Sequence, residues 1–150
     1  MPLEIEKYKK PKSRPVIRVL PISNSILKVE GITLQHLFEK SLWDLAYLIS
    51  PGSCSLATHY DCVMKVEVSA DNTKNLLINF LTEVLSLTYT QQAIFCTMYA
   101  EEITEKKLEA QIFGTWFKNY SSKIKSIANS KCIVNRKEDS SYSGSIVFEL

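Results

Sequence analysis

GITLQHLFEKSLWDLAYLIS, residues 31–50, is the stretch that decides the fold. Its apolar side chains recur at three- and four-residue steps, so they fall on one face of a helix. Thr33 can cap that helix, because its hydroxyl can accept a hydrogen bond from a backbone N–H of the first turn. The following Ser-Pro-Gly at residues 50–52 ends the pattern, since proline and glycine do not continue a helix comfortably. The spacing predicts an amphipathic helix of about four to five turns.

One further helix and several strands are predicted around this stretch. Residues 62–69 alternate between apolar and mostly polar side chains, as in a half-buried strand. A second helix is predicted to begin near Asp71 or Asn72 and to end at the poor helix formers of residues 88–90. The expected fold class is therefore α+β, with two helices packed on one face of a largely antiparallel or mixed β-sheet. The other predicted extended segments are residues 16–20, 26–29, 94–99, 108–117, 124–134 and 146–150.

The connecting segments are predicted from their composition. Residues 23–25, Ser-Asn-Ser, are polar and turn-like, because short polar side chains bond to their own backbone. Residues 50–60 and 135–144 are expected to be loops, and the charged residues 101–107 a turn. Gly114, inside an apolar run, indicates a bulge or a close backbone approach.

Length and charge limit the classes of protein that fit. The chain of 150 residues suits one domain, expected over 16–150, with residues 1–15 as a flexible basic lead-in. A net charge of +2 is too mild to imply strong direct binding of nucleic acid. The basic residues near the start leave two readings, contact with phosphate or a solvated tail. No apolar run is long enough to cross a bilayer, and we expect a cytoplasmic protein, with the nucleus as second location.

Few residues offer catalytic chemistry. The four cysteines, Cys54, Cys62, Cys96 and Cys132, form no CxxC pair, and with two histidines a zinc site is not expected. We expect reduced, mostly buried thiols in a reducing compartment. Glycine-rich phosphate loops, GxSxG and HExxH are absent from the sequence. The residues alone therefore point to no catalytic constellation.

The sequence from residue 31 onward resembles the archease family. Gly31, Thr33, Leu34, Phe38 and Glu39 reproduce the pattern Gly-x-Thr-Leu-x-x-x-Phe-Glu after a strand. The resemblance extends over about residues 16–150. It continues in the family's order through VEV (66–68), NLLINFLTEVL (75–85, with an acid at Glu83), KLEAQIFGTWF (107–117), KSIANS (125–130) and the final Glu149-Leu150.

This resemblance implies a function. Members of the family activate an RtcB-type RNA ligase, promoting its guanylylation and repeated turnover in tRNA splicing, and are not ligases themselves. The implied partner is that ligase, together with the nucleotide, GTP or ATP, that the ligase binds. The implied cofactor is a divalent metal, calcium or magnesium, held by oxygen ligands.

The resemblance also implies site residues, at which this sequence departs from the family. An Asp in a His-Thr-Ala-Asp stretch and an Asp just before the last residue hold the family's metal, and a late lysine assists. Pro21-Ile22-Ser23-Asn24 stands at that stretch, Glu149 at the second Asp, and Lys125 at the lysine. The expected metal-ligand positions are therefore Asn24, Glu149 and the terminal carboxylate of Leu150, and Lys125 is the expected cofactor-binding residue. Because hard cations prefer anionic oxygens, the neutral Asn24 predicts a weakened site.

Three functional hypotheses follow. The first is an archease-like accessory protein that activates its ligase through Asn24, Lys125 and Glu149. The second is a diverged protein-interaction module without metal, regulating the ligase or another partner. The third is a small independent enzyme in which His59, beside Asp61, acts as a general base. The first hypothesis assigns no catalytic residue to this chain.

Overall fold

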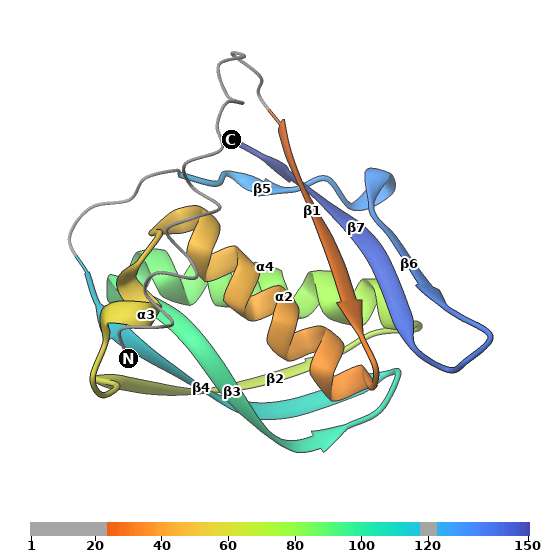
Figure 1. Cartoon of the computed structure of the whole chain (residues 1–150), viewed down its shortest axis with the longest axis horizontal. Helices are drawn as coiled ribbons and strands as arrows, with labels where there is room; N and C mark the ends of the chain where they lie inside the picture. The colour runs from red at the N-terminus through yellow and green to blue at the C-terminus, as the bar shows by residue number, and fades with distance from the viewer. Residues whose placement is uncertain (1–23, 118–122) are drawn as a thin grey trace.

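The computed structural model describes residues 24–117 and 123–150. It contains two antiparallel sheets with a pair of long helices between them (Figure 1). The first sheet has β7 (Tyr142–Glu149) at its centre. Its other strands are β1 (Asn24–Gly31), β5 (Ser126–Ile127) and β6 (Ile133–Arg136). The second sheet has the order β2 (Cys62–Ser69), β4 (Lys107–Trp116), β3 (Ala93–Ile103). The predicted α+β class is confirmed, and the strands are divided between two sheets.

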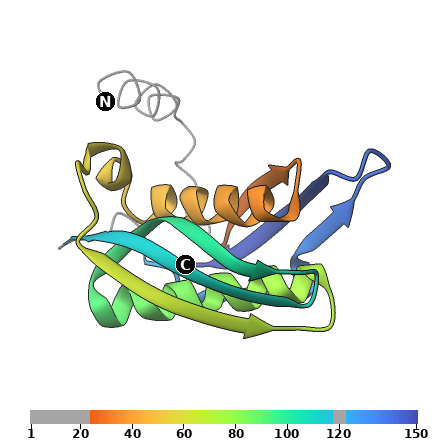
Figure 2. The same ribbon diagram turned by 90° about the horizontal axis from the view of Figure 1, so that it is seen from below.

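Each long helix contacts both sheets. The first, α2 (Leu34–Ile49), packs on β1 and β3, and the second, α4 (Thr73–Gln91), packs on β2, β3, β5 and β6. Figure 2 shows the second sheet across the front with both helices behind it. Phe38 of α2 and Phe80 of α4 meet at the centre with ring centroids 5.6 Å apart, and neither side chain is exposed. Both helices therefore contribute to one core that the two sheets cover.

The helix predictions rest on local signals, and both helices form. Thr33 caps α2 by accepting from the His36 backbone N–H at 3.1 Å. Asn72 caps α4 by accepting from the Asn75 backbone N–H at 2.9 Å. The predicted end at residues 88–90 is too early, because α4 continues to Gln91. Thr88 is buried in the core, so tertiary packing overrides its low helix propensity.

Several segment boundaries differ from the predictions. Asn24 and Ser25 are not in a turn but begin β1, because β7 provides hydrogen-bonding partners for them. The predicted turn at residues 101–107 shortens to 104–106, and the loop at 135–144 shortens to 137–141. The predicted loop 50–60 contains a short helix, α3 (Ser53–Leu56). The stretch 124–134 is interrupted by a 3₁₀ turn, η2 (Asn129–Lys131). The predicted lead-in 1–15, the strand 16–20 and residues 21–23 lie outside the described residues.

Gly114 confirms the prediction of a close backbone approach. A Cβ at this position would lie 2.4 Å from the carbonyl oxygen of Ile94, so no larger residue fits without movement. A shift in the β3–β4 register lies nearby, between Phe95 and Thr97. Cys96 therefore occupies an irregular position of β3.

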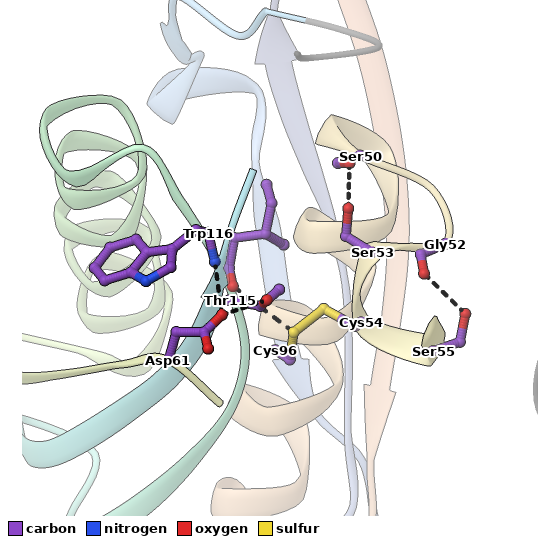
Figure 3. The surroundings of a disulfide bond; sticks show 10 residues. Ser50, Gly52, Ser53, Cys54, Ser55, Asp61, Cys96, Thr115 and Trp116 are labelled. Carbon is purple, nitrogen blue, oxygen red and sulfur yellow. Dashed lines mark hydrogen bonds between the residues drawn. A yellow bond between two sulfur atoms is a disulfide. The ribbon is translucent and has the colours of Figure 1, made fainter. Parts of the chain in front are cut away.

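The expectation of four reduced thiols is wrong for two of them. Cys54 of α3 and Cys96 of β3 form a disulfide with Cα atoms 5.6 Å apart (Figure 3). Their spacing of 42 residues carries no signal, and only the folding of α3 against β3 brings them together. Cys62 and Cys132 are free and buried, as expected. Within the described residues, no helix is both long enough and apolar enough to span a membrane.

Candidate functional site at the end of strand β7

The end of β7 brings together the positions that the sequence singled out. In the β1–β7 register, Asn24 is the partner of Glu149. On the other side of β7, the Lys125 backbone N–H donates to the Glu149 carbonyl oxygen at 2.7 Å. Leu150 follows directly, half-buried against the core. Two chain segments remote in sequence therefore meet the last residues of the chain at one place.

Ser126 belongs to this site and was missed by sequence reasoning. It is the β5 partner of Glu149, and its Oγ donates a hydrogen bond of 2.5 Å to Glu149 Oε1. A hydrogen bond from a hydroxyl to a carboxylate is short and strong, so Ser126 orients the Glu149 side chain. The only sequence signal was its place inside the KSIANS stretch, because a single serine carries no pattern of its own.

The segment that carries Lys125 and Ser126 is fixed from two directions. On one side, the Tyr89 hydroxyl of α4 accepts from the backbone N–H of the buried Ile124 at 2.8 Å. On the other side, the buried Cys132 thiol accepts from the Val147 N–H of β7 at 3.3 Å. The thiol thus replaces a backbone acceptor where the edge strand is interrupted. As a result, the two-residue β5 is held in register beside Glu149.

The site is open to solvent and has mixed charge. Glu149, Ser126 and Lys125 are all exposed. Lys123 lies nearby in sequence, with its Nζ 5.9 Å from the centroid of the Tyr89 ring, a cation–π distance. Among the described residues, no ion pair joins the Lys125 ammonium to the Glu149 carboxylate. The Lys125 charge therefore remains available for an external anion.

The donor set matches a hard divalent cation in kind but is low in charge. Glu149 supplies one carboxylate, and Ser126 supplies a neutral hydroxyl. Calcium takes six to eight oxygen ligands, several of them anionic in tight sites. Within the part of the chain that the structure describes, no group of three or more His, Cys, Asp or Glu side chains is placed to hold a metal. A cation here would need water or a partner protein to complete its coordination.

His59 and Asp61 form the other polar pair considered in the sequence. His59 Nε2 lies 3.1 Å from Asp61 Oδ1. Asp61 Oδ2 also accepts from Thr115 Oγ1 at 3.0 Å and from the Trp116 N–H at 3.3 Å (Figure 3). These two bonds, that from Thr115 first, hold the pKa of Asp61 below its usual range. Asp61 is therefore a connection between the loop and β4, and this explains its position without catalysis.

Comparisons with known proteins agree on one family. A model of the Archease protein family (MTH1598/TM1083) matches residues 24–150. The solution structure of Methanobacterium thermoautotrophicum protein 1598 aligns with a TM-score of 0.66 at 16% identity, over 86% of this chain and 94% of that one. A Thermotoga maritima crystal structure, described as an archease and possible chaperone, aligns with a TM-score of 0.60 at 12% identity, over 91% and 100%. At these identities the structures show the fold alone. No curated protein matches the sequence.

Proposed function

This chain belongs to the archease protein family, and from that premise we propose that it is the accessory protein of an RtcB-type RNA ligase. In this proposal it promotes guanylylation and turnover of the ligase during tRNA splicing and performs no catalysis alone. The observation that carries the proposal is the meeting of Asn24, Lys125 and Glu149 at the end of β7. Pairing of the backbones of β1 and residue 125 with β7 brings these three positions together, which supports the proposal.

Each residue has a role that its chemistry supports. The Lys125 ammonium, exposed and without an ion pair among the described residues, offers a positive charge to a phosphate of the nucleotide, GTP or ATP, bound by the ligase. Glu149, oriented by Ser126, offers a carboxylate to a divalent cation or to a basic group of the ligase. We propose the terminal carboxylate of Leu150 as a further ligand, and Asn24 as another because its position pairs with Glu149 in the β1–β7 register.

A cation held in this way is bound weakly. One side-chain carboxylate stands where the family has two, so the Coulomb attraction is lower by roughly a few kcal/mol at intermediate dielectric. Magnesium or calcium would therefore bind with full strength only when the ligase or its nucleotide adds negative oxygens. This predicts that metal dependence appears in the complex at lower metal concentration than in the isolated protein.

A second candidate is a protein-interaction module without metal. It is favoured by the Ser126–Glu149 hydrogen bond, which already uses one oxygen of Glu149, the one side-chain carboxylate that the described residues bring to the site. In that case Glu149 recognises the ligase or another partner directly. The two candidates share the same residues and differ in whether a cation lies between the proteins.

The test is a guanylylation assay with the purified ligase, GTP and this protein. We expect Glu149→Gln and Lys125→Ala each to reduce stimulation by about tenfold or more, the effect of losing one charge-assisted contact. Glu138→Gln and Lys106→Ala are matched controls, because both residues are exposed and lie in turns, residues 137–141 and 104–106, that do not belong to the candidate site. Ser126→Ala should reduce stimulation less, since it removes only the orientation of Glu149.

Calorimetry separates the two candidates. Magnesium and calcium are titrated into the wild type, the Glu149→Gln variant and the complex with the ligase. Heat that requires both Glu149 and the ligase supports the metal-dependent activator. Full stimulation without any metal binding attributable to Glu149 supports the interaction module. Binding to the ligase with no stimulation by the wild type contradicts the activator proposal.

A further inference from the structure

The loop of residues 51–61 is joined to the second sheet by one covalent bond in its middle. Cys54, in α3, carries this bond to Cys96 of β3 (Figure 3). Within the described part of the chain, the hydrogen bonds of residues 51–60 stay between residues 50 and 61. Examples are Ser50 Oγ to Ser53 Oγ at 2.5 Å and Ser55 Oγ to the Gly52 carbonyl at 3.3 Å. The disulfide is therefore the main polar or covalent tie of this segment to β3.

The two sulfur-bearing residues differ in access. Cys96 is 1% exposed and lies in the core. Cys54 is half-buried and lines an open pocket of about 330 Å³, together with Trp43, Ser55, Ala57, Thr58, His59 and Tyr60. Cys96 is not among the residues that line this pocket. A small molecule in the pocket therefore meets Cys54 first.

The same pocket holds a base. His59 is 76% exposed at its side chain, and its Nε2 contacts Asp61 at 3.1 Å. With Nε2–H donating to Asp61, Nδ1 is the nitrogen that can accept a proton, and it contacts the exposed Thr58 hydroxyl at 3.2 Å. Because His59 and Cys54 line the same pocket, a thiol bound there can reach both a base and the disulfide. Here the thiol to be deprotonated is the incoming one.

We propose that Cys54 is a thiol–disulfide exchange site for a small thiol of the glutathione class. His59 takes the proton of the incoming thiol, and the thiolate sulfur attacks Sγ of Cys54. A new S–S bond forms at Cys54 as the Cys54–Cys96 bond breaks, and its electron pair leaves on Cys96 Sγ, which is then protonated. A second small thiol can attack the mixed disulfide, giving the Cys54 thiol and the small-molecule disulfide, a two-electron reduction of the protein.

The consequence is a loop that opens in a reducing medium and closes in an oxidising one. Once the bond is broken, Asp61 still ties the end of the loop to β4, through Thr115 and Trp116. Residues 51–60 then keep their local hydrogen bonds and the contact of the Tyr60 ring with Phe113 of β4, whose ring centroids are 6.2 Å apart. The core cysteines take no part, because Cys62 and Cys132 are buried and burial raises the pKa of the Cys62 thiol.

The test begins with the full-length protein purified without reductant. Alkylation under denaturing conditions should find two free thiols, Cys62 and Cys132, in the part of the chain that holds all four cysteines. Brief treatment with reduced glutathione, an acid quench and peptide mapping should place glutathione on Cys54. Four free thiols before treatment, or glutathione found mainly on Cys96, would overturn the proposal.

Single-residue variants test the proposal through the rates of their reaction with glutathione. In Cys96→Ser the remaining Cys54 thiol should react with oxidised glutathione at least about tenfold faster than the Cys96 thiol of Cys54→Ser. His59→Ala in the wild-type background should slow exchange several-fold at neutral pH and leave it unchanged at a pH where glutathione is fully ionised. Equal rates at the two cysteines, or a His59→Ala effect that does not depend on pH, contradicts the proposal.

Discussion

In the first sheet, β7 is paired along its whole length by β1, but its other side is shared by the two-residue β5 and the four-residue β6. In the second sheet, β2, β4 and β3 are continuous strands of 8, 10 and 11 residues, and a disulfide ties α3 to β3. The interruption leaves backbone and side-chain groups to be satisfied by Tyr89, Cys132 and Ser126. Exposed polar groups of the candidate site collect where the pairing is broken.

The acidic residues also differ between the interrupted first sheet and the continuous second sheet. Glu67, Glu109 and Glu102 are register partners across β2, β4 and β3 and form an acidic row on the second sheet. Lys107 Nζ lies 3.5 Å from Glu102 and 3.3 Å from Glu109, so its ammonium offsets part of the negative charge of this row. Glu149 stands alone with a serine. The candidate site is therefore distinguished from the acidic row by its position at an interrupted sheet edge and not by its number of acidic residues.

The largest expected effect comes from removing the covalent tie of the second sheet. In the chain-entropy model, a disulfide closing a loop of this length stabilises the fold by about 4 kcal/mol. Urea unfolding of the wild type with dithiothreitol should therefore show a large fall in the free energy of unfolding. The double variant Cys54→Ser/Cys96→Ser is the control, because it should be equally weakened and insensitive to reductant. A wild-type midpoint that does not move with reductant would show that the two sheets differ less than the structure indicates.

A pair of glycines compares the rigidity of the two sheets. Gly114→Ala would place a Cβ 2.4 Å from the Ile94 carbonyl oxygen, between two long strands. Gly144→Ala would place a Cβ 2.3 Å from the Ile133 carbonyl oxygen, on the short edge strand β6. Because β6 is a four-residue edge strand with no buried side chain, whereas β3 is an eleven-residue strand packed in the core, β6 should adapt more easily. We therefore expect costs of about 3 kcal/mol for Gly114→Ala and about 1 kcal/mol for Gly144→Ala.

Thermal unfolding of the two alanine variants measures this difference. Gly114→Ala should also slow formation of the nearby disulfide, since it displaces β3 beside Cys96. Equal destabilisation would mean that β6 is as firmly held as β3, and it would contradict the interpretation of the first sheet's edge as the adaptable one.

The sequence predicted the elements whose signals are local. Thr33 and Asn72 are caps, and each acts within three residues, so the starts of α2 and α4 could be read directly. The alternation of β2 was equally visible, and its exposed and buried positions agree with the prediction. The division of the strands into two sheets could not be predicted, because it depends on pairings such as Asn24 with Glu149 between opposite ends of the domain.

Only those positions of the candidate site that the family pattern includes could be predicted from the sequence. Asn24, Lys125 and Glu149 came from that pattern, and the register places them together. Ser126 did not, because its role depends on the register of a two-residue strand held by Tyr89 and Cys132. The disulfide was missed for the same physical reason, since a spacing of 42 residues says nothing about which cysteines meet.

The smallest expected effects are on the pH dependence of stability, and they come from two aspartates, Asp61 beside the second sheet and Asp139 beside the first. Hydrogen bonds from Thr115 Oγ1 and the Trp116 N–H hold the pKa of Asp61 below its ordinary value of 3.8. Hydrogen bonds from the Ser141 hydroxyl, at 2.6 Å, and the Ser141 N–H, at 3.0 Å, do the same for the pKa of Asp139. A lowered pKa means that the folded state favours the ionised carboxylate. The stabilisation is therefore fully present when the pH is above the ordinary pKa of the carboxyl group. It is lost as the pH falls through the lowered pKa of the folded state.

Asp61→Ala should therefore lower the melting temperature by a constant amount near neutral pH, and the difference from wild type should shrink as the pH falls below 3.8. Asp139→Ala should follow the same pH dependence with a smaller amplitude. The hydrogen bonds of Asp139 reach a residue only two positions away, in a turn that the Lys137 N–H already closes by donating to the Ser141 carbonyl at 2.7 Å. The hydrogen bonds of Asp61 join segments 54 and 55 residues apart. A long-range tie restricts more of the unfolded chain than a local one, so Asp61 should stabilise the fold more. If the two variants melt alike, or if either difference grows on acidification, the loop beside Cys54 is not held through Asp61 as the structure indicates.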